Sequence, residues 1–389
     1  MKIKKLKFEG HEVLGDLEID FTDEKGEPSE IVAFIGDNGT GKTKVLESII
    51  DTIGYENSKG PLTSAMIERE QESIRLTKNS VTLIVENLDL EDNLKKNLGF
   101  SLSEQKLIVW LPAELKIENH LSIEHHRNAQ FRSKLELVEV AHLWHLDEIN
   151  EYIVDKINKE IYKDMSQPAK VVFDKESKKV NDIFQNLDVG IKMIGLSGES
   201  GLPIFMNKQS KLVELKDLSS GEKQLFFRML NLKRLNVNNA VIIIDEPETS
   251  LHPEWQRKII DVYKNIGENN QIILATHSPL ILGSVPTEGV RILSRDDEGV
   301  IQVEHGYQTY GKSAEDLLRG PMDLSSLRTD EMESQLNKAR QLLQADAYDS
   351  NEYKDLMKTL KIALGSDDQD IMLIEMGASR RRRQNAKDK

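Results

Sequence analysis

The sequence predicts an α/β fold built around a largely parallel β-sheet. The main observation is a set of three runs of strand length, at residues 31–35, 240–244 and 271–275, in which every residue except Gln271 is apolar. Runs without alternation are typical of strands that are buried on both faces of a sheet. Between the last two runs lies a helical pattern, from about residue 254 to 266, with short connections on both sides. Strand, helix and strand in this order predict a parallel arrangement.

Bulk composition limits the class of protein. The length of 389 residues suggests roughly two to three domains, and the absence of cysteine excludes disulfides and cysteine-based zinc sites. No apolar run approaches the roughly 20 residues that span a bilayer, and no signal peptide is recognisable. We therefore expect a cytoplasmic protein without a membrane contact. The net charge of −14 restricts any DNA contact to local basic patches, such as Arg380 to Arg383.

The remaining elements follow from hydrophobic periodicity. Two amphipathic helices, at 329–344 and 352–364, predict an antiparallel hairpin near the C-terminus. The polar end of the chain, from Ser379, is expected to be disordered. The other predicted elements are strands at 3–8, 17–21, 81–85 and 106–111, short strands over 187–215, and helices at 42–53, 120–164 and 225–232.

Residues 36–43 match the pattern G-x-x-x-x-G-K-[ST] and are called the phosphate loop below. Glycines let backbone N–H groups turn around phosphate oxygens, and a following helix presents its positive end to the same anion. A glycine-rich turn that only caps a helix is the alternative, but the preceding buried strand and the following helix favour a phosphate site. The expected contacts are Gly36, Asn38, Gly39, Gly41, Lys42 and Thr43.

An acidic pair follows the buried run 240–244. Because strand ends of an α/β sheet open into the ligand crevice, Asp245 and Glu246 are expected to face the phosphate site. Asp245 and the Thr43 hydroxyl are hard oxygen ligands suited to Mg²⁺. Glu246 is expected to orient and deprotonate the attacking water. The alternative is a solvated acidic turn at a strand end.

Residues 218–224, the Ser-Gly turn, precede an apolar helix and form a second possible anion seat. Capping offers a different explanation, in which Ser219 is an N-cap and Glu222 its reciprocal partner. The residues alone leave both interpretations open. The residues concerned are Ser219, Ser220, Gly221 and Glu222.

Four motifs, at 36–43, 218–224, 245–247 and 275–278, occur in the order found in ABC ATPases, and the chain resembles that family. The resemblance implies an ABC-type P-loop ATPase head with a mixed, largely parallel sheet, a helical insert lobe and a C-terminal helical hairpin. It also implies ATP and Mg²⁺ as ligands and two sites that form between two copies paired head to tail. By position, Ser219 and Gly221 would contact the γ-phosphate bound to the other copy, and His277 would sense it.

The sequence after the acidic pair differs from that of transporters. Glu248 to Pro253 and the later Thr-His-Ser-Pro resemble the RecF, SMC and OLD branch, and the N-terminal strands do so too. This resemblance places Thr249 to His252 at the dimer interface. The glutamine that couples nucleotide to partner is not identifiable, and Gln71 and Gln105 are both candidates.

Within this branch, the chain lacks the heptads of a long-armed SMC protein and the C-terminal strand pattern of an OLD nuclease. The segment from Thr309 to Arg328, followed by helices, resembles stand-alone ATPases of bacterial anti-phage systems such as Septu and PARIS. That resemblance implies a homodimer or higher homo-oligomer and a separate nuclease effector. A RecF-like DNA-repair ATPase is the alternative. A transporter subunit is disfavoured by Leu251-His252-Pro253.

The predicted organisation has an ATPase head that is interrupted by a helical insert. The basic run at Arg380 to Arg383 is either a solvated tail or an arm that docks DNA or a partner. The motifs at 36–43, 218–224, 245–247 and 275–278 correspond to the Walker A, signature, Walker B and switch motifs of ABC ATPases. The expected segments are 1–119 with the Walker A motif, 120–186 as the helical insert, 187–309 with the signature, Walker B and switch motifs, 310–378 as the C-terminal helical segment, and 379–389 as a basic disordered tail.

Overall fold

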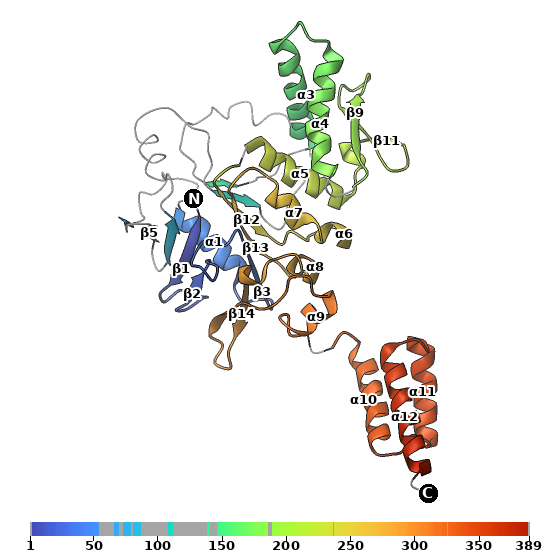
Figure 1. The fold of residues 1–389 in the computed structure, drawn as a ribbon. Coiled ribbons are helices and arrows are strands. Elements are labelled where there is room, and N and C mark those ends of the chain that lie inside the picture. The colour runs from blue at the N-terminus through green and yellow to red at the C-terminus, as the bar shows by residue number, and fades with distance from the viewer. Residues whose placement is uncertain are drawn as a thin grey trace. The chain divides into compact units, whose positions relative to one another are not determined.

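The computed structural model divides into two compact units, Met1–Met322 and Asp323–Lys389 (Figure 1). The candidates Gln71 and Gln105 lie outside the described residues, and so do residues 120–137 of the expected insert. The structure describes residues 2–53, 66–69, 73–78, 81–86, 108–111, 138–140, 146–185, 189–235, 237–324 and 326–387.

The central sheet of the first unit has seven strands in the described chain, in the order β15-β14-β3-β13-β12-β7-β8. All neighbouring pairs are parallel except β14 and β15. The three apolar runs form the adjacent strands β3, β13 and β12, so the predicted α/β fold with a mixed, largely parallel sheet is confirmed. The strands are β3 (Ile31–Gly36), β7 (Ile108–Leu111), β8 (Val138–Val140), β12 (Val241–Asp245), β13 (Gln271–Ala275), β14 (Val290–Arg295) and β15 (Ile301–His305).

The two faces of this sheet belong to different hydrophobic cores, because side chains alternate along each strand. On β3, Ala33 and Ile35 join the core that includes Phe226, whereas Phe34 joins the core that includes Leu46. Helix α5 (Ser220–Leu235) therefore packs on one face and helix α1 (Lys42–Ile53) on the other, as can be followed in Figure 1. Helix α7 (Ile259–Lys264) lies on the α5 face.

A second, antiparallel sheet covers the α1 face with the order β2-β1-β6-β5-β4. The buried Gln271 side chain links it to β13: its Oε1 accepts from the Ile3 N–H at 2.6 Å and its Nε2 donates to the Ile3 carbonyl at 3.0 Å. The strands are β1 (Ile3–Phe8), β2 (Glu18–Asp20), β4 (Met66–Arg69), β5 (Ser73–Lys78) and β6 (Val81–Glu86).

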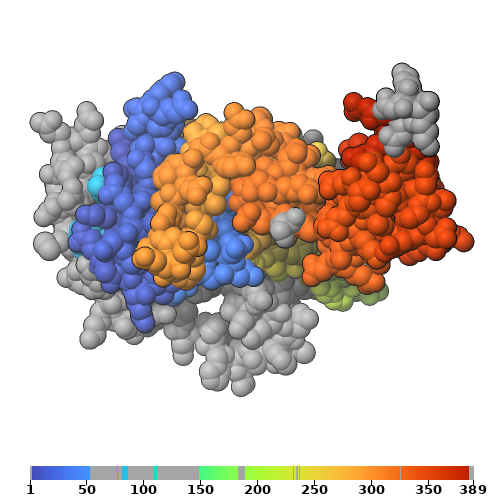
Figure 2. Space-filling model, turned by 90° about the horizontal axis from the view of Figure 1, so that it is seen from below, coloured from blue at the N-terminus to red at the C-terminus, as the bar shows by residue number. Residues whose placement is uncertain are grey.

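The buried Arg291 side chain links the antiparallel sheet to β14. Its guanidinium donates to the Asp20 carbonyl at 2.6 Å and to the Thr22 carbonyl at 3.2 Å. Burial lowers the pKa of Arg291 to about 10, and these backbone acceptors compensate for the lost water. In Figure 2 the surfaces of the N-terminal strands (blue) and of the β14–β15 region (orange) accordingly lie side by side.

The expected helical insert is only partly helical. Helices α3 (Leu146–Lys163) and α4 (Ala169–Gln185) pack beside a small sheet of β9 (Lys192–Leu196), β10 (Pro203–Met206) and β11 (Leu212–Glu214). Residues 138–140, which the sequence analysis assigned to a helix, form strand β8 instead. The correction has a tertiary cause, because β8 pairs in parallel with β7 from a distant part of the chain.

The C-terminal unit contains three helices in its described part: α10 (Asp330–Gln344), α11 (Asn351–Leu364) and α12 (Gln369–Lys387). The predicted helical character is confirmed, but the expected disordered tail from Ser379 is wrong, because α12 continues through it. The first turns of α12 bury Ile371, Ile374 and Ala378 in the core of the unit, so the helix is held by packing.

The boundary of this unit also differs from the expected position at residues 309 and 310. Helix α9 (Ala314–Arg319) belongs to the first unit because Leu317 is fully buried in its main core. The Gly311 N–H donates to the Gly283 carbonyl at 3.0 Å, which holds the preceding segment to the same unit. The division therefore lies after Met322.

Two substitutions on α11 test the packing of the C-terminal unit. Leu360 is fully buried and Ile362, two residues later, is 79% exposed. We expect Leu360→Ala to lower the free energy of unfolding by about 2–5 kcal/mol through a cavity. The matched change Ile362→Ala should stay within about 0.5 kcal/mol. Urea unfolding followed by circular dichroism measures both, and equal effects would contradict the packing described.

Candidate functional site

The phosphate loop connects β3 to α1. Among the glycines of this loop, Gly36 tolerates a side chain least, because a Cβ there would lie 2.0 Å from the Leu293 carbonyl oxygen on β14. The first residue of α1 is Lys42, so the positive end of a 12-residue helix faces the loop. The loop therefore has the backbone shape and the polarity that a phosphate site requires.

Lys42 is buried at the base of this loop. Its Nζ donates to the Gly36 carbonyl at 2.8 Å and to the Asp37 carbonyl at 2.9 Å. Burial lowers the pKa of Lys42, and the charges of Glu246 and Asp37 partly oppose this shift. An ammonium group held among carbonyl oxygens can transfer its hydrogen bonds to phosphate oxygens without leaving the loop.

The Thr43 hydroxyl donates to Oδ2 of Asp245 at 3.1 Å. Residues 202 positions apart meet because β3 and β12 are parallel strands, separated only by β13, and end at the same edge. Adjacent ligands of an octahedral Mg²⁺ stand about 2.9 Å apart, so this pair of oxygens fits the ion. Burial raises the pKa of Asp245, and the Thr43 hydrogen bond opposes the rise.

Magnesium held here would keep several water ligands. Among the residues that the structure describes, no group of three or more histidine, aspartate or glutamate side chains could hold a metal ion. At a phosphate site, Mg²⁺ is usually bound by one or two protein oxygens, by phosphate oxygens and by several waters.

Glu246 adopts a backbone conformation that is unusual for its residue type. Its φ is 43°, in the left-handed region, and its N–H donates to the Ala275 carbonyl at 2.9 Å. Non-glycine residues in this region store strain and cluster at functional sites. The Thr249 hydroxyl donates to Oε2 of Glu246 at 3.4 Å.

Glu248 joins the acidic turn to the end of β13, a role that the sequence analysis did not assign. Its carboxylate accepts from the Thr276 hydroxyl at 2.9 Å and from the His277 N–H at 2.5 Å. Burial raises the pKa of Glu248, and the His277 hydrogen bond lowers it. The signal available in the sequence was that Glu248 is the third acid of Asp-Glu-Pro-Glu, residues 245–248.

His277 lies close enough to the phosphate loop to interact electrostatically with Lys42. Burial and then the positive charge of Lys42 lower the pKa of His277, whereas Glu246 raises it. A pKa below the usual value leaves the imidazole neutral at pH 7, with one nitrogen able to donate and the other able to accept.

The Ser-Gly turn forms a capping box. The Ser219 N–H donates to Oε2 of Glu222 at 2.8 Å, and the Glu222 N–H donates to Oγ of Ser219 at 3.3 Å. The capping interpretation therefore holds. Ser219 and Ser220 are also exposed at the start of α5, which leaves room for an anion from outside. Their contact with a phosphate remains a prediction.

Gly221 lets the start of α5 pack closely against the loop that follows the acidic turn. A Cβ at Gly221 would lie 2.2 Å from the carbonyl oxygen of Ser250, whose own φ is 62°. Gln256 braces the same loop: its Nε2 donates to the Leu251 carbonyl at 2.9 Å, and its Oε1 accepts from the Ser278 hydroxyl at 2.7 Å. The loop thus contacts both α5 and the segment that contains His277.

The geometry is that of a P-loop nucleotide site, and a family comparison agrees with it. Residues 31–283 match the model of the family described as "AAA domain, putative AbiEii toxin, Type IV TA system". The match covers more than half of the chain. The chain belongs to this AAA domain family.

Curated relatives of this AAA chain include a retron probable ATPase and a Septu protein. The retron Vc95 probable ATPase of Vibrio cholerae serotype O1 biovar El Tor is 26% identical over 48% of this chain and 38% of its own length. The Septu protein PtuA of Bacillus thuringiensis is 23% identical over 84% of this chain and 85% of its own length. The expected resemblance to Septu ATPases is confirmed.

Solved structures similar to this AAA chain include the SMC head domain from Thermotoga maritima. That likeness has a TM-score of 0.43 at 15% identity and covers 78% of this chain and 99% of the other.

No helix in the described residues is long and apolar enough to cross a membrane.

Arg295 is a further residue at the AAA site that the sequence analysis missed. Its guanidinium donates to the Gly39 carbonyl of the phosphate loop at 2.8 Å and to the Gly299 carbonyl at 2.8 Å. It comes from the end of β14, beyond all four motifs, so no pattern in the sequence pointed to it. Arg295 adds an exposed positive charge at the rim of the loop.

The close approach of Gly221 to Ser250 leads to a first prediction for the site. We expect Gly221→Ala to cost about 1–3 kcal/mol of stability, because the added methyl group collides with a backbone carbonyl. Gly198→Ala is the matched control, since its Cβ would meet nothing within 4 Å. Thermal unfolding and ATP turnover of both variants measure the effect. A Gly221→Ala protein as stable and active as the control would contradict this packing.

Glu248 provides a second prediction. Glu248→Ala removes the acceptor of the Thr276 and His277 hydrogen bonds and should cost about 1–3 kcal/mol, with slower ATP turnover. Glu248→Gln keeps an acceptor oxygen and should retain more stability and activity than Glu248→Ala. Urea unfolding and a phosphate-release assay compare the three proteins. Equal losses for both variants would show that the charge, and not the hydrogen bonding, is what matters.

Proposed function

We propose that this chain is a magnesium-dependent ATPase whose sites are completed when two copies pair head to tail. The single observation that supports catalysis most directly is the 3.1 Å hydrogen bond between Thr43 and Asp245. It supports the proposal because a hydroxyl and a carboxylate this close together, beside a phosphate loop, could serve as neighbouring metal ligands. Glu246 follows Asp245 directly.

Each residue then has one role in hydrolysis. Lys42 and the N-terminus of α1 bind the β- and γ-phosphates. Thr43 and Asp245 would hold magnesium, which would supply positive charge beside the phosphate oxygens. Glu246 orients the attacking water and accepts its proton. His277, with a neutral imidazole, donates a hydrogen bond toward the γ-phosphate.

The placement of α1 and α5 supports the paired arrangement. Leu46 of α1 and Phe226 of α5 belong to cores on opposite faces of the central sheet. The N-terminus of α1, where the phosphate would bind, and the start of α5 therefore belong to helices on opposite faces of this sheet. A second copy, turned head to tail, could bring its own Ser219 and Gly221 to that phosphate.

The biological role that we propose is regulation of a separate effector, a nuclease, in bacterial anti-phage defence. Support comes from the Septu relative, whose match extends over 85% of its length. The retron relative adds less, because the match spans 38% of that protein. Co-purification with the product of a neighbouring nuclease gene tests the proposal. DNA cleavage by this chain alone would contradict it, and ATP-dependent binding to gapped DNA would favour the RecF-like alternative.

Glu246→Gln tests the mechanism and the pairing together. The variant should bind ATP, hydrolyse it at least about a hundredfold more slowly, and accumulate as a pair, because the amide cannot accept a proton. Light scattering with chromatography measures the pair, and phosphate release measures turnover. Lys42→Ala is the control that should lose ATP binding and stay unpaired. Normal hydrolysis by Glu246→Gln would exclude this residue as the base.

A further inference from the structure

Helix α12 is apolar on two sides. One side buries Ile371 and Ile374 in the core of the C-terminal unit. The opposite side exposes Met372, Leu373 and Met376, which are 50%, 59% and 65% accessible. A helix that is apolar all round is normally covered on both sides, so the exposed side is a candidate contact surface.

The arginine run is divided by the helical spacing into two pairs. Arg381 pairs with Asp346 at 2.7 Å, and Arg382 pairs with Asp349 at 2.9 Å, so both hold α12 to the turn before α11. Arg380 and Arg383 face elsewhere and line a shallow groove together with Met372, Met376 and Glu375, whose carboxylate is paired with Lys361. The outer face of α12 is defined here as Met372, Leu373, Met376, Arg380 and Arg383.

We propose that the outer face of α12 docks an amphipathic, acidic helix of a partner protein. Apolar side chains of the partner would pack on Met372, Leu373 and Met376, since methionine adapts its shape to many partners. Carboxylates farther along the same side of the partner helix would pair with Arg380 and Arg383. Apolar and basic halves in sequence along one helix therefore specify the chemistry of the occupant.

Charge complementarity distinguishes this occupant from a nucleic acid and from a second copy. Phosphates would satisfy the two arginines but leave three exposed apolar side chains without a contact. In an antiparallel pair of α12 helices, the arginines of one copy would approach the start of the other. The acids there are already engaged, because Arg328 pairs with Asp368 and Asp370 at 2.8 Å each, and Arg340 pairs with Asp370 at 2.6 Å.

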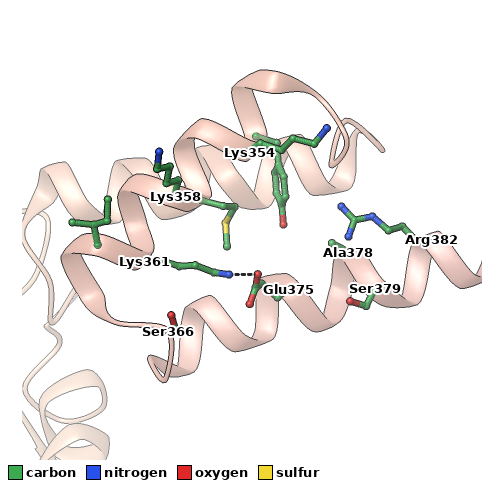
Figure 3. Close-up of a pocket in the computed structure, with 11 residues that line it drawn as sticks. Lys354, Lys358, Lys361, Ser366, Glu375, Ala378, Ser379 and Arg382 are labelled. Atoms are coloured by element: carbon green, nitrogen blue, oxygen red, sulfur yellow. Dashed lines mark ion pairs between the residues drawn. The ribbon is translucent and has the colours of Figure 1, made fainter.

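The neighbouring groove between α11 and α12 also carries basic side chains and therefore provides a control surface (Figure 3). Lys361 and Glu375 form an ion pair across this groove. Lys354 and Lys358 on α11 also line it and are exposed. Reversing these two lysines changes the net charge of the unit as much as reversing Arg380 and Arg383 does, without altering the outer face.

The experiment uses the full chain and a fluorescein-labelled synthetic helix that has two leucines one turn apart and two glutamates farther along the same side. Fluorescence anisotropy should detect binding. Met372→Ser with Met376→Ser, and separately Arg380→Glu with Arg383→Glu, should each weaken it at least about tenfold. The control, Lys354→Glu with Lys358→Glu, should weaken it by less than about threefold. The arginine-reversed protein should bind a version of the helix with lysines in place of glutamates.

Three results would overturn the proposal. Equal weakening by the arginine and lysine reversals would show general attraction between opposite charges. Binding of a labelled DNA duplex that depends on Arg380 and Arg383 but not on Met372 and Met376, with no binding of the helix, would assign the face to nucleic acid. Self-association of the unmodified chain that is lost in the Met372→Ser, Met376→Ser variant would assign the outer face of α12 to a second copy. Circular dichroism of each variant verifies that the exposed substitutions leave the fold intact.

Discussion

The site depends on three parallel strands ending at one edge of the central sheet. Strands β3, β13 and β12 are adjacent and in parallel register, so the loops that follow them meet. The phosphate loop, the acidic turn and the segment with His277 come from these three strand ends. Each loop would be too mobile alone to hold a phosphate and a metal in a fixed geometry, and the hydrogen-bonded strands remove that freedom.

Polar contacts then connect the loops to one another. Thr43 bonds to Asp245 across the sheet edge, and Glu248 bonds to the residues that follow β13. Gly221 packs against Ser250, so the loop after the acidic turn also contacts the start of α5. A change at the phosphate site therefore has a contiguous physical route to the Ser-Gly turn, which is the surface proposed to meet a second copy.

The C-terminal unit shows how helical spacing turns the members of one arginine run toward two different sides of a helix. Arg381 and Arg382 face their own unit and pair with Asp346 and Asp349. These pairs are partly exposed and contribute little energy individually, so the buried apolar side of α12 holds the helix. Arg380 and Arg383 lie on the outer face, where they continue the exposed apolar stripe.

The sequence by itself determined the sheet core and the order of the motifs. Strands buried on both faces are apolar at nearly every position, so β3, β12 and β13 could be recognised from the sequence. The combination of glycines with Lys42 in the phosphate loop has few alternative interpretations. Strand β8 was missed because three residues carry little periodicity, and α12 because apolar side chains on both sides conceal its inner face. Only the tertiary structure decided the contacts of Gly221, Glu248 and Arg295. Each depends on a partner distant in the chain, and no local pattern encodes such a partner.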